Sequence, residues 1–183
     1  MELCLAYLDD CVFAGRLDIV IRAIHLLKDA AAEIGLDLNM EKCKLILTPA
    51  CPEDISLPAL PSGLSPIHAD GFKFLGAPIG SKRFCEGLTA KRVSKNQLLL
   101  NALGDLADPQ IALLLLRQCA AFCKIAFSIR VTPQADHKEA LSDFDASVRA
   151  CFEDLSGLRP SDAQWAQALL AVSRGGLGLR SCQ

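Results

Sequence analysis

Several features that define other protein classes are missing from this sequence of 183 residues. Twelve glycines and nine prolines are too few for a collagen-like or low-complexity chain. No Cys-x-x-Cys pair occurs among the nine cysteines, and no second pair at zinc-ligand spacing follows Cys119 and Cys123, which argues against a structural zinc site. No basic stretch followed by an apolar run comes after Met1. We therefore expect an intracellular protein, nuclear or cytoplasmic, that is not secreted and keeps its thiols reduced.

The composition is that of a folded protein. Hydrophobic residues account for 51% of the chain and charged residues for 22%, which excludes a disordered chain, and the length suits one domain or one domain with a small appendage. The longest apolar stretch, residues 111–129, contains Arg117, Gln118 and Lys124. Because a charge near the centre of a membrane span costs about 2.5–3.5 kcal/mol, we expect a long soluble helix here and no transmembrane segment.

Charge is distributed unevenly along the chain, although the net charge is only −2. Residues 1–80 include six basic and eleven acidic side chains, residues 81–130 include eight and three, and residues 131–183 include five and seven. A basic segment between acidic flanks can attract an anionic partner. A solvated helix surface is the alternative, and charge alone leaves both interpretations open.

Strand and helix patterns alternate over the first 80 residues, and helical patterns fill the remainder. Short apolar runs at 2–7 and 11–15, separated by Leu8-Asp9-Asp10, predict a β-hairpin. Further strands are predicted at 43–48, 72–75 and 77–79, a Pro-rich loop at 50–70, and helices at 16–35, 89–106, 109–130, 134–155 and 161–172. This order predicts an α+β fold, with a partial α+β domain at 1–80 and a helical domain at 81–183.

Two adjacent carboxylates, Asp9 and Asp10, follow Tyr7 and Leu8 at the tip of the predicted hairpin. Like charges repel at short range, and a divalent cation removes that repulsion. Mg²⁺ usually takes one or two carboxylates together with substrate phosphates, and two such ions can activate the attacking oxygen and stabilise the leaving group in phosphoryl transfer. Taken alone, these four residues are more typical of an ordinary acidic turn, because Asp-Asp is common in turns.

Two further segments follow the acidic pair in a fixed order. Residues 35–43 read Gly-Leu-Asp-Leu-Asn-Met-Glu-Lys-Cys, and residues 72–80 read Phe-Lys-Phe-Leu-Gly-Ala-Pro-Ile-Gly. Together with Tyr-Leu-Asp-Asp, this series resembles motifs C, D and E of the palm domain of reverse transcriptases, in particular those of non-LTR (LINE-type) retrotransposons. Segments 116–118, 128–133 and 174–180 are similar to thumb segments of that family. The resemblance covers nearly the whole chain and implies RNA-directed DNA synthesis by nucleotidyl transfer.

The resemblance implies roles for individual residues of the first two motifs. Asp9 would be a ligand of Mg²⁺, Asp10 a second and less direct ligand, and Tyr7 would lie beside them under the substrate. Lys42 matches the lysine of motif D, which can act as a general acid on the departing pyrophosphate. An ammonium group near phosphate can both stabilise charge and donate a proton. A surface lysine that caps a strand is the alternative for Lys42.

Contacts to nucleic acid are also implied. Residues 72–80 would form the primer grip, with Phe72, Leu75 and Gly76 near the nucleic acid, because glycine permits close approach of the backbone; a plain hairpin is the alternative. Basic side chains of the helical region would contact the phosphates of an RNA template and a DNA primer without reading sequence. These candidates are Lys82, Arg83, Lys91, Arg92, Lys95, Arg117, Lys124 and Arg130. Exposed helix charge is the alternative interpretation.

Parts of a reverse transcriptase are missing from these residues. The fingers, the earlier palm strands and the first metal-binding aspartate precede the hairpin in the family, whereas here only six residues precede Tyr7. Asp143-Phe144-Asp145-Ala146 superficially resembles the missing motif, but its periodicity is helical. We therefore expect weak Mg²⁺ binding, a strand at 2–7 without a neighbour, and no polymerase activity of the isolated chain.

The first hypothesis is therefore a fragment of a retrotransposon reverse transcriptase, whose partner would be the missing fingers and palm segment. Two other functions stay open. One is a non-catalytic nucleic-acid-binding module built on the helices. The other is a helical interaction protein in which the hairpin resemblance is accidental.

Overall fold

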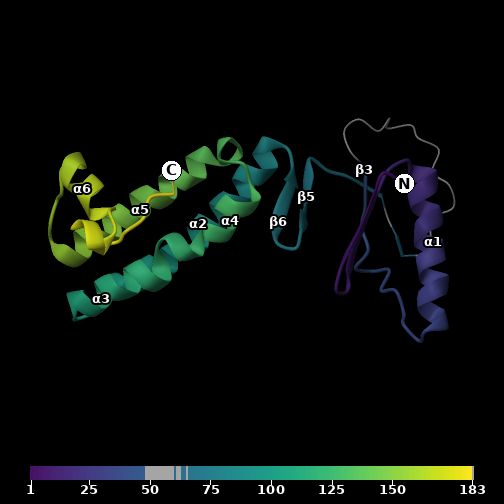
Figure 1. Cartoon of the computed structure of the whole chain (residues 1–183), viewed down its shortest axis with the longest axis horizontal. Coiled ribbons are helices and arrows are strands. Elements are labelled where there is room, and N and C mark those ends of the chain that lie inside the picture. The colour runs from purple at the N-terminus through teal and green to yellow at the C-terminus, as the bar shows by residue number, and fades with distance from the viewer. Residues whose placement is uncertain (48–59, 61–62, 65, 183) are drawn as a thin grey trace. The chain divides into compact units, whose positions relative to one another are not determined.

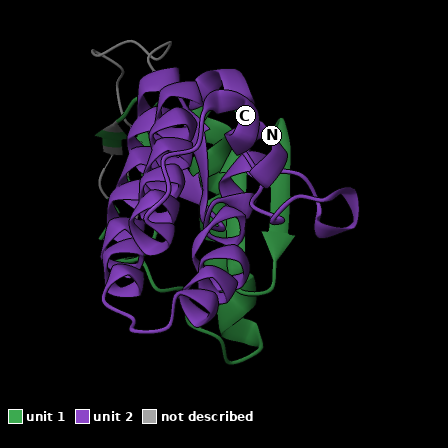
Figure 2. Ribbon diagram, turned by 90° about the vertical axis from the view of Figure 1, so that its left-hand side faces the viewer, with its two compact units in different colours: residues 1–70 green, residues 71–183 purple. Residues whose placement is uncertain are grey.

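The computed structural model of this chain describes residues 1–47, 60, 63–64 and 66–182. The protein has the predicted α+β fold, and its elements follow in the order labelled in Figure 1. Residues 1–70 and 71–183 form two compact units, which Figure 2 distinguishes by colour. The division lies ten residues before the boundary expected near residue 81. The reason is that the second predicted hairpin packs on the helices that follow it.

The first unit contains a hairpin, a helix and a pair of short strands. Its elements are β1 (Leu3–Tyr7), β2 (Asp10–Ala14), α1 (Leu17–Glu33), β3 (Leu45–Leu47) and β4 (Pro66–His68). The predicted hairpin and helix are confirmed, and α1 is followed by Gly35 in a left-handed conformation (φ 76°). β4 was not predicted: it lies in the stretch expected to be a loop at 50–70, most of which is outside the described residues. It pairs in parallel with β3, a non-local contact that leaves no local signal.

The first unit buries a small core and leaves its hairpin exposed. Its buried hydrophobic cluster consists of Val20, Leu45, Leu47 and Leu64. In contrast, residues 1–11 are all exposed, and β1 pairs only with β2 among the residues described. The strand that was expected to lack a neighbour therefore has β2 beside it.

The second unit consists of a hairpin followed by helices. Its elements are β5 (Gly71–Phe74), β6 (Ala77–Gly80), α2 (Lys82–Gly104), α3 (Pro109–Leu115), α4 (Ala126–Val131), α5 (Lys138–Ser156) and α6 (Asp162–Ala168). Local caps explain where the helices begin. Ser81 accepts a hydrogen bond from the Phe84 amide, so α2 begins seven residues earlier than predicted. Asp108 and Ser161 cap α3 and α6, as predicted.

The helix expected over 109–130 is interrupted in its middle, so the prediction of one continuous helix is wrong. Five residues, Leu116–Ala120, form a π-helical turn, and Ala121 leaves the helical conformation (ψ −128°). The amide of Asn96 on α2 donates to the Ala120 carbonyl at 2.9 Å, which satisfies an acceptor at the break. A tertiary contact of this kind has no counterpart in the local sequence pattern.

The same stretch, Pro109–Val131, is long and apolar enough to cross a membrane by length and composition, the only such helix in the described part of the chain. Its apolar character has an explanation in the core, because Leu116, Ala120 and Ile125 are at most 1% exposed. Arg117, Lys124 and Arg130 lie within it, as noted from the sequence.

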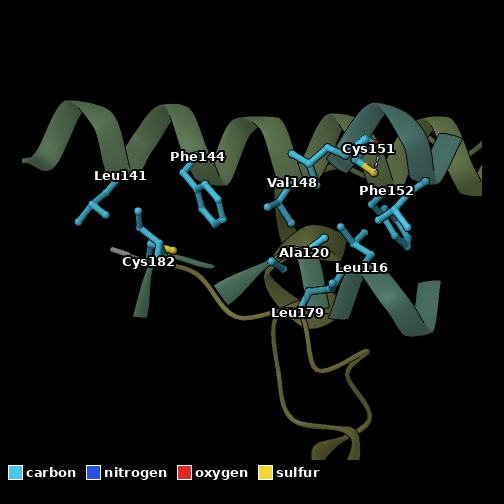
Figure 3. Packing of buried hydrophobic residues seen from close by; sticks show 13 residues of the cluster. Leu116, Ala120, Leu141, Phe144, Val148, Cys151, Phe152, Leu179 and Cys182 are labelled. Carbon is cyan, nitrogen blue, oxygen red and sulfur yellow. Dashed lines mark hydrogen bonds between the residues drawn. The ribbon is translucent and has the colours of Figure 1, made fainter. Parts of the chain in front are cut away.

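The core of the second unit lies between α5, the 116–120 turn and the C-terminal segment. Leu141, Phe144 and Val148 project from the same side of α5, and Leu116 and Leu179 lie on that side of the helix, as Figure 3 shows. All five side chains are at most 3% exposed. Burial of such side chains contributes about 1.5–3 kcal/mol each to the stability of the unit.

A buried polar group joins α2 to the start of α5. The Oγ1 of Thr89 and the Nδ1 of His137 are 3.1 Å apart, and Glu86 accepts a hydrogen bond from the Ala140 amide at 2.6 Å. Burial lowers the pKa of His137, although the carboxylates of Glu86 and Asp136 act in the opposite direction. His137 is therefore held as a neutral ring at neutral pH.

The C-terminal segment is fastened back onto the helices. Asp145 on α5 accepts hydrogen bonds from the Ser181 hydroxyl at 2.5 Å and the Cys182 amide at 3.0 Å. This use of Asp145 agrees with the helical interpretation of residues 143–146. Gly176 permits a close chain crossing, since a Cβ there would lie 2.1 Å from the Leu170 carbonyl oxygen.

Alanine substitutions at Gly176, which is tightly packed, and at Gly87, which is not, should have opposite effects on stability. We expect Gly176→Ala to lower the free energy of unfolding by roughly 1–3 kcal/mol, because the Leu170 backbone must move. Gly87→Ala, in the interior of α2 with no atom within 4 Å of the new Cβ, should raise it by about 0.5–1 kcal/mol. Urea unfolding followed by circular dichroism measures both. Equal effects of the two substitutions would contradict the tight crossing.

Candidate nucleic-acid interface

The acidic pair lies at the tip of the first hairpin. Tyr7 and Asp10 are the last pair of the β1–β2 ladder, which leaves Leu8 and Asp9 as a two-residue loop. Leu8 has a left-handed backbone (φ 54°) and is 86% exposed. Asp9 and Asp10 are both exposed, so the predicted location of the carboxylates is confirmed.

The acidic pair does not fit a self-contained magnesium site. Among the described residues, no group of three or more His, Cys, Asp or Glu side chains is arranged to hold a metal ion. Two carboxylates from one loop offer a cation oxygen ligands on one side only. Mg²⁺ commonly completes such a coordination shell with substrate phosphates.

Lys42 lies on a different loop of the first unit. Its backbone amide donates to the carbonyl and to the side-chain oxygen of Asn39, both at 3.2 Å, which closes a turn before β3. The side chain is exposed. The turn accounts for the backbone of this residue, and its general-acid role stays a prediction.

The second hairpin turns as its sequence predicts. Phe74 and Ala77 form the last pair of β5 and β6, and Leu75 and Gly76 form the loop with φ values of 48° and 84°. Two left-handed residues in a two-residue loop match the twist of the flanking strands. Leu75 is 45% exposed at the tip, whereas Phe72 is half-buried within β5.

Arg92 joins this hairpin to two helices of the same unit. From α2, its guanidinium donates to the Gly76 carbonyl at 2.5 Å and to the hydroxyl of Ser128 on α4. The same group lies 5.3 Å from the centre of the Phe127 ring. Arg92 was predicted to contact phosphate, and the structure adds a role that holds the hairpin, α2 and α4 together.

Arg117 is less available than the other predicted basic residues. Its side chain is half-buried, and its Cδ lies 3.1 Å from the position that a Cβ on Gly178 would take. Its Nε is buried without a hydrogen-bond partner in the described structure. Packing under the glycine-rich C-terminal segment therefore accounts for much of the burial of the Arg117 side chain.

The remaining basic side chains of residues 81–130 are exposed and unneutralised. They are Lys82, Arg83, Lys91, Lys95, Lys124 and Arg130. The ion pairs found among the described residues all involve Arg16, Arg149 or Arg159 instead.

Two of the three acidic residues of the same segment, Glu86 and Asp108, accept hydrogen bonds from backbone amides. Glu86 binds the Ala140 amide, Asp108 caps α3, and Asp105 lies at the C-terminal end of α2. The positive charge of the segment is therefore presented to solvent rather than balanced within the fold.

Two of these cations occupy an unfavourable position in their own helix. Lys82 and Arg83 are in the first turn of α2, which contains no acidic residue. A cation near a helix N-terminus opposes the helix dipole at a cost of about 0.3–1 kcal/mol. Helix stability therefore does not explain why these two residues are basic.

Sequence reasoning missed Phe127 and Ser128. The polar Ser128 is 1% exposed, whereas the aromatic Phe127 beside it is 46% exposed. The available signal was the spacing Lys124-x-x-Phe127-x-x-Arg130, which places an aromatic ring between two cations at helical intervals.

Comparison with known proteins identifies no relative: no family model matches the chain, and no curated protein or solved structure is significantly similar to it.

Removing the guanidinium of Arg92 should loosen the second hairpin. Arg92→Met keeps the aliphatic stem but leaves the Gly76 carbonyl and the buried Ser128 hydroxyl without a donor, at a cost of about 1–3 kcal/mol. We expect faster amide hydrogen exchange in β6. Lys91→Met, at the exposed neighbouring position, should change stability by less than about 0.5 kcal/mol. We call the contacts of Arg92 with Gly76 and Ser128 the Arg92 clamp. Unchanged amide exchange in Arg92→Met would contradict this clamp.

Proposed function

We propose that this chain is the palm and thumb portion of a non-LTR retrotransposon reverse transcriptase, and that these residues hold nucleic acid but do not polymerise it by themselves. The order of features supports the proposal: Asp9 and Asp10 at one hairpin tip, a second hairpin ending at Gly76, and then a basic helical region.

The observation that carries the proposal is the exposed positive charge of residues 81–130. These side chains form no ion pair in the described structure, and two of the three acidic residues of the segment, Glu86 and Asp108, accept hydrogen bonds from backbone amides. Phosphate groups are the natural counterions for such a surface, because Lys and Arg gain affinity by releasing cations from the nucleic-acid backbone. The expected ligand is the hybrid of an RNA template and a DNA primer, bound through shape and backbone.

Catalysis would need more than these residues provide. The resemblance to reverse transcriptases implies that Mg²⁺ bound near Asp9 and Asp10 would activate the primer end and stabilise the leaving pyrophosphate. The described residues offer no third ligand opposite the pair. The function proposed for these residues in isolation is therefore binding, with nucleotidyl transfer requiring a further polypeptide segment that supplies the missing aspartate.

A second candidate is a nucleic-acid-binding module without any polymerase partner. The observation that favours it is the core of residues 71–183, which is built within that unit and includes the elements that carry the exposed cations. The exposed apolar side chains of β1, such as Leu5 at 48%, favour instead a role in protein association for the first unit.

Binding should be steeply salt-dependent and should weaken when cations of α2 are removed. For an RNA–DNA hybrid, the double variant Lys91→Ala/Lys95→Ala should flatten the slope of log K against log salt by about one for each lysine that contacts a phosphate. The matched control is Lys28→Ala/Lys138→Ala, which removes two exposed lysines from α1 and α5. Fluorescence anisotropy at several salt concentrations measures both slopes. An equal change in both variants, or no binding at all, would overturn the proposed surface.

The isolated chain should not extend a primer. With a primed RNA template, Mg²⁺ and deoxynucleotides, we expect no product above background, because the described residues supply no third ligand beside Asp9 and Asp10. A gel-based extension assay tests this expectation. Robust synthesis that disappears in Asp9→Asn would show that these residues contain a complete catalytic site.

A further inference from the structure

Phe127 has an environment that is unusual for a large aromatic side chain. It lies on α4, where its neighbours Ser128 and Ile125 are each 1% exposed. Phe127 itself is 46% exposed, although the unit has a hydrophobic core nearby that could have taken an aromatic ring. Burial therefore does not explain the choice of phenylalanine here.

The ring is held on one side by the clamp. The Arg92 guanidinium lies 5.3 Å from the ring centre, and a Cβ placed on Gly76 would be 3.4 Å from the Phe127 Cε1 atom. Because Arg92 is itself tied to Gly76 and Ser128, the ring rests on a fixed base rather than on a mobile loop. A fixed, half-exposed ring can accept a planar partner at little cost in side-chain entropy.

Two exposed cations flank the ring along the chain. Lys124, at the end of the short 3-10 turn Phe122–Lys124, precedes Phe127 by three residues, and Arg130 follows it by three on α4. Side chains three apart on a helix are neighbours, so Arg130 borders the ring on α4. Neither cation forms an ion pair with a described residue. The exposed ring is thus bordered by positive charge that the fold leaves unneutralised.

We propose that Phe127 is a stacking site for an unpaired nucleobase, with Lys124 and Arg130 contacting the phosphates of the same strand. The inference rests on the proposed nucleic-acid binding and names a contact beyond phosphate neutralisation. An aromatic ring between cations matches the two parts of a nucleotide, a π face and an anion, and stacking of this kind tolerates any base. An apolar protein partner would leave both cations without counterions, so charge complementarity favours the nucleotide.

The test compares two strands that differ only in their bases. The full chain is titrated with a labelled 20-nucleotide oligothymidine and with an abasic strand of equal length and charge. Wild-type protein should prefer the strand with bases. Phe127→Ala should lose roughly 5- to 150-fold in affinity for that strand, the range expected for one stacked base, and should keep its affinity for the abasic strand. The salt slope should not change, because no cation is removed.

Further variants separate stacking from folding. Phe127→Trp should retain or increase the preference for bases, whereas Phe127→Leu, which keeps apolar volume without a π face, should behave like Phe127→Ala. Matching circular dichroism spectra and melting temperatures of Phe127→Leu and wild type would show that the clamp remains folded.

The outcomes that would overturn the inference are distinct. If wild-type protein binds both strands equally, or if Phe127→Leu keeps the full preference, Phe127 does not stack on a base, while phosphate binding still stands. If neither strand binds and an acidic peptide or anionic vesicles bind instead, the nucleic-acid function fails together with the stacking site.

Discussion

The contacts of Arg92 are the interaction on which the architecture of the candidate interface depends. One guanidinium satisfies a carbonyl at the tip of the second hairpin and a buried hydroxyl on α4, and it also supports the ring of Phe127. A lysine could not make these contacts together, because its ammonium group lacks the planar fork of arginine. The hairpin, α2 and α4 are thereby fixed relative to one another, so the side chains they present have defined positions.

The basic side chains of the second unit lack acidic partners because several of its carboxylates are hydrogen-bonded to the backbone. Glu86, Asp108 and Asp145 are each hydrogen-bonded to a backbone amide, so they serve the fold rather than neutralise lysines. The cations of α2 and α4 are consequently left to solvent, and Lys82 and Arg83 remain so at some cost to their helix. A surface that opposes its own local stability in this way is typical of binding rather than of folding.

Features determined by neighbouring residues could be predicted from the sequence, and features determined by distant contacts could not. The hairpin that presents Asp9 and Asp10, the turn at Gly76 and the helix cap at Asp108 all have short-range signals, and the structure contains each of them. The pairing of β4, the break at Ala121 and the clamp of Arg92 depend on partners far away in the chain. The ring of Phe127 has a local signal in its spacing from Lys124 and Arg130, but only its contacts in the structure show that it lies outside the core.

The central claim is that nucleic acid binds the second unit across α2 and α4. Amide chemical shifts of the nitrogen-15-labelled chain, recorded during titration with an RNA–DNA hybrid, test it most directly. The account predicts that the largest changes fall on the backbone around Lys91, Lys95 and residues 124–130, while the exposed face of α5 is unaffected. Changes concentrated on α5 and α6, or a spectrum that does not respond to the hybrid, would contradict it.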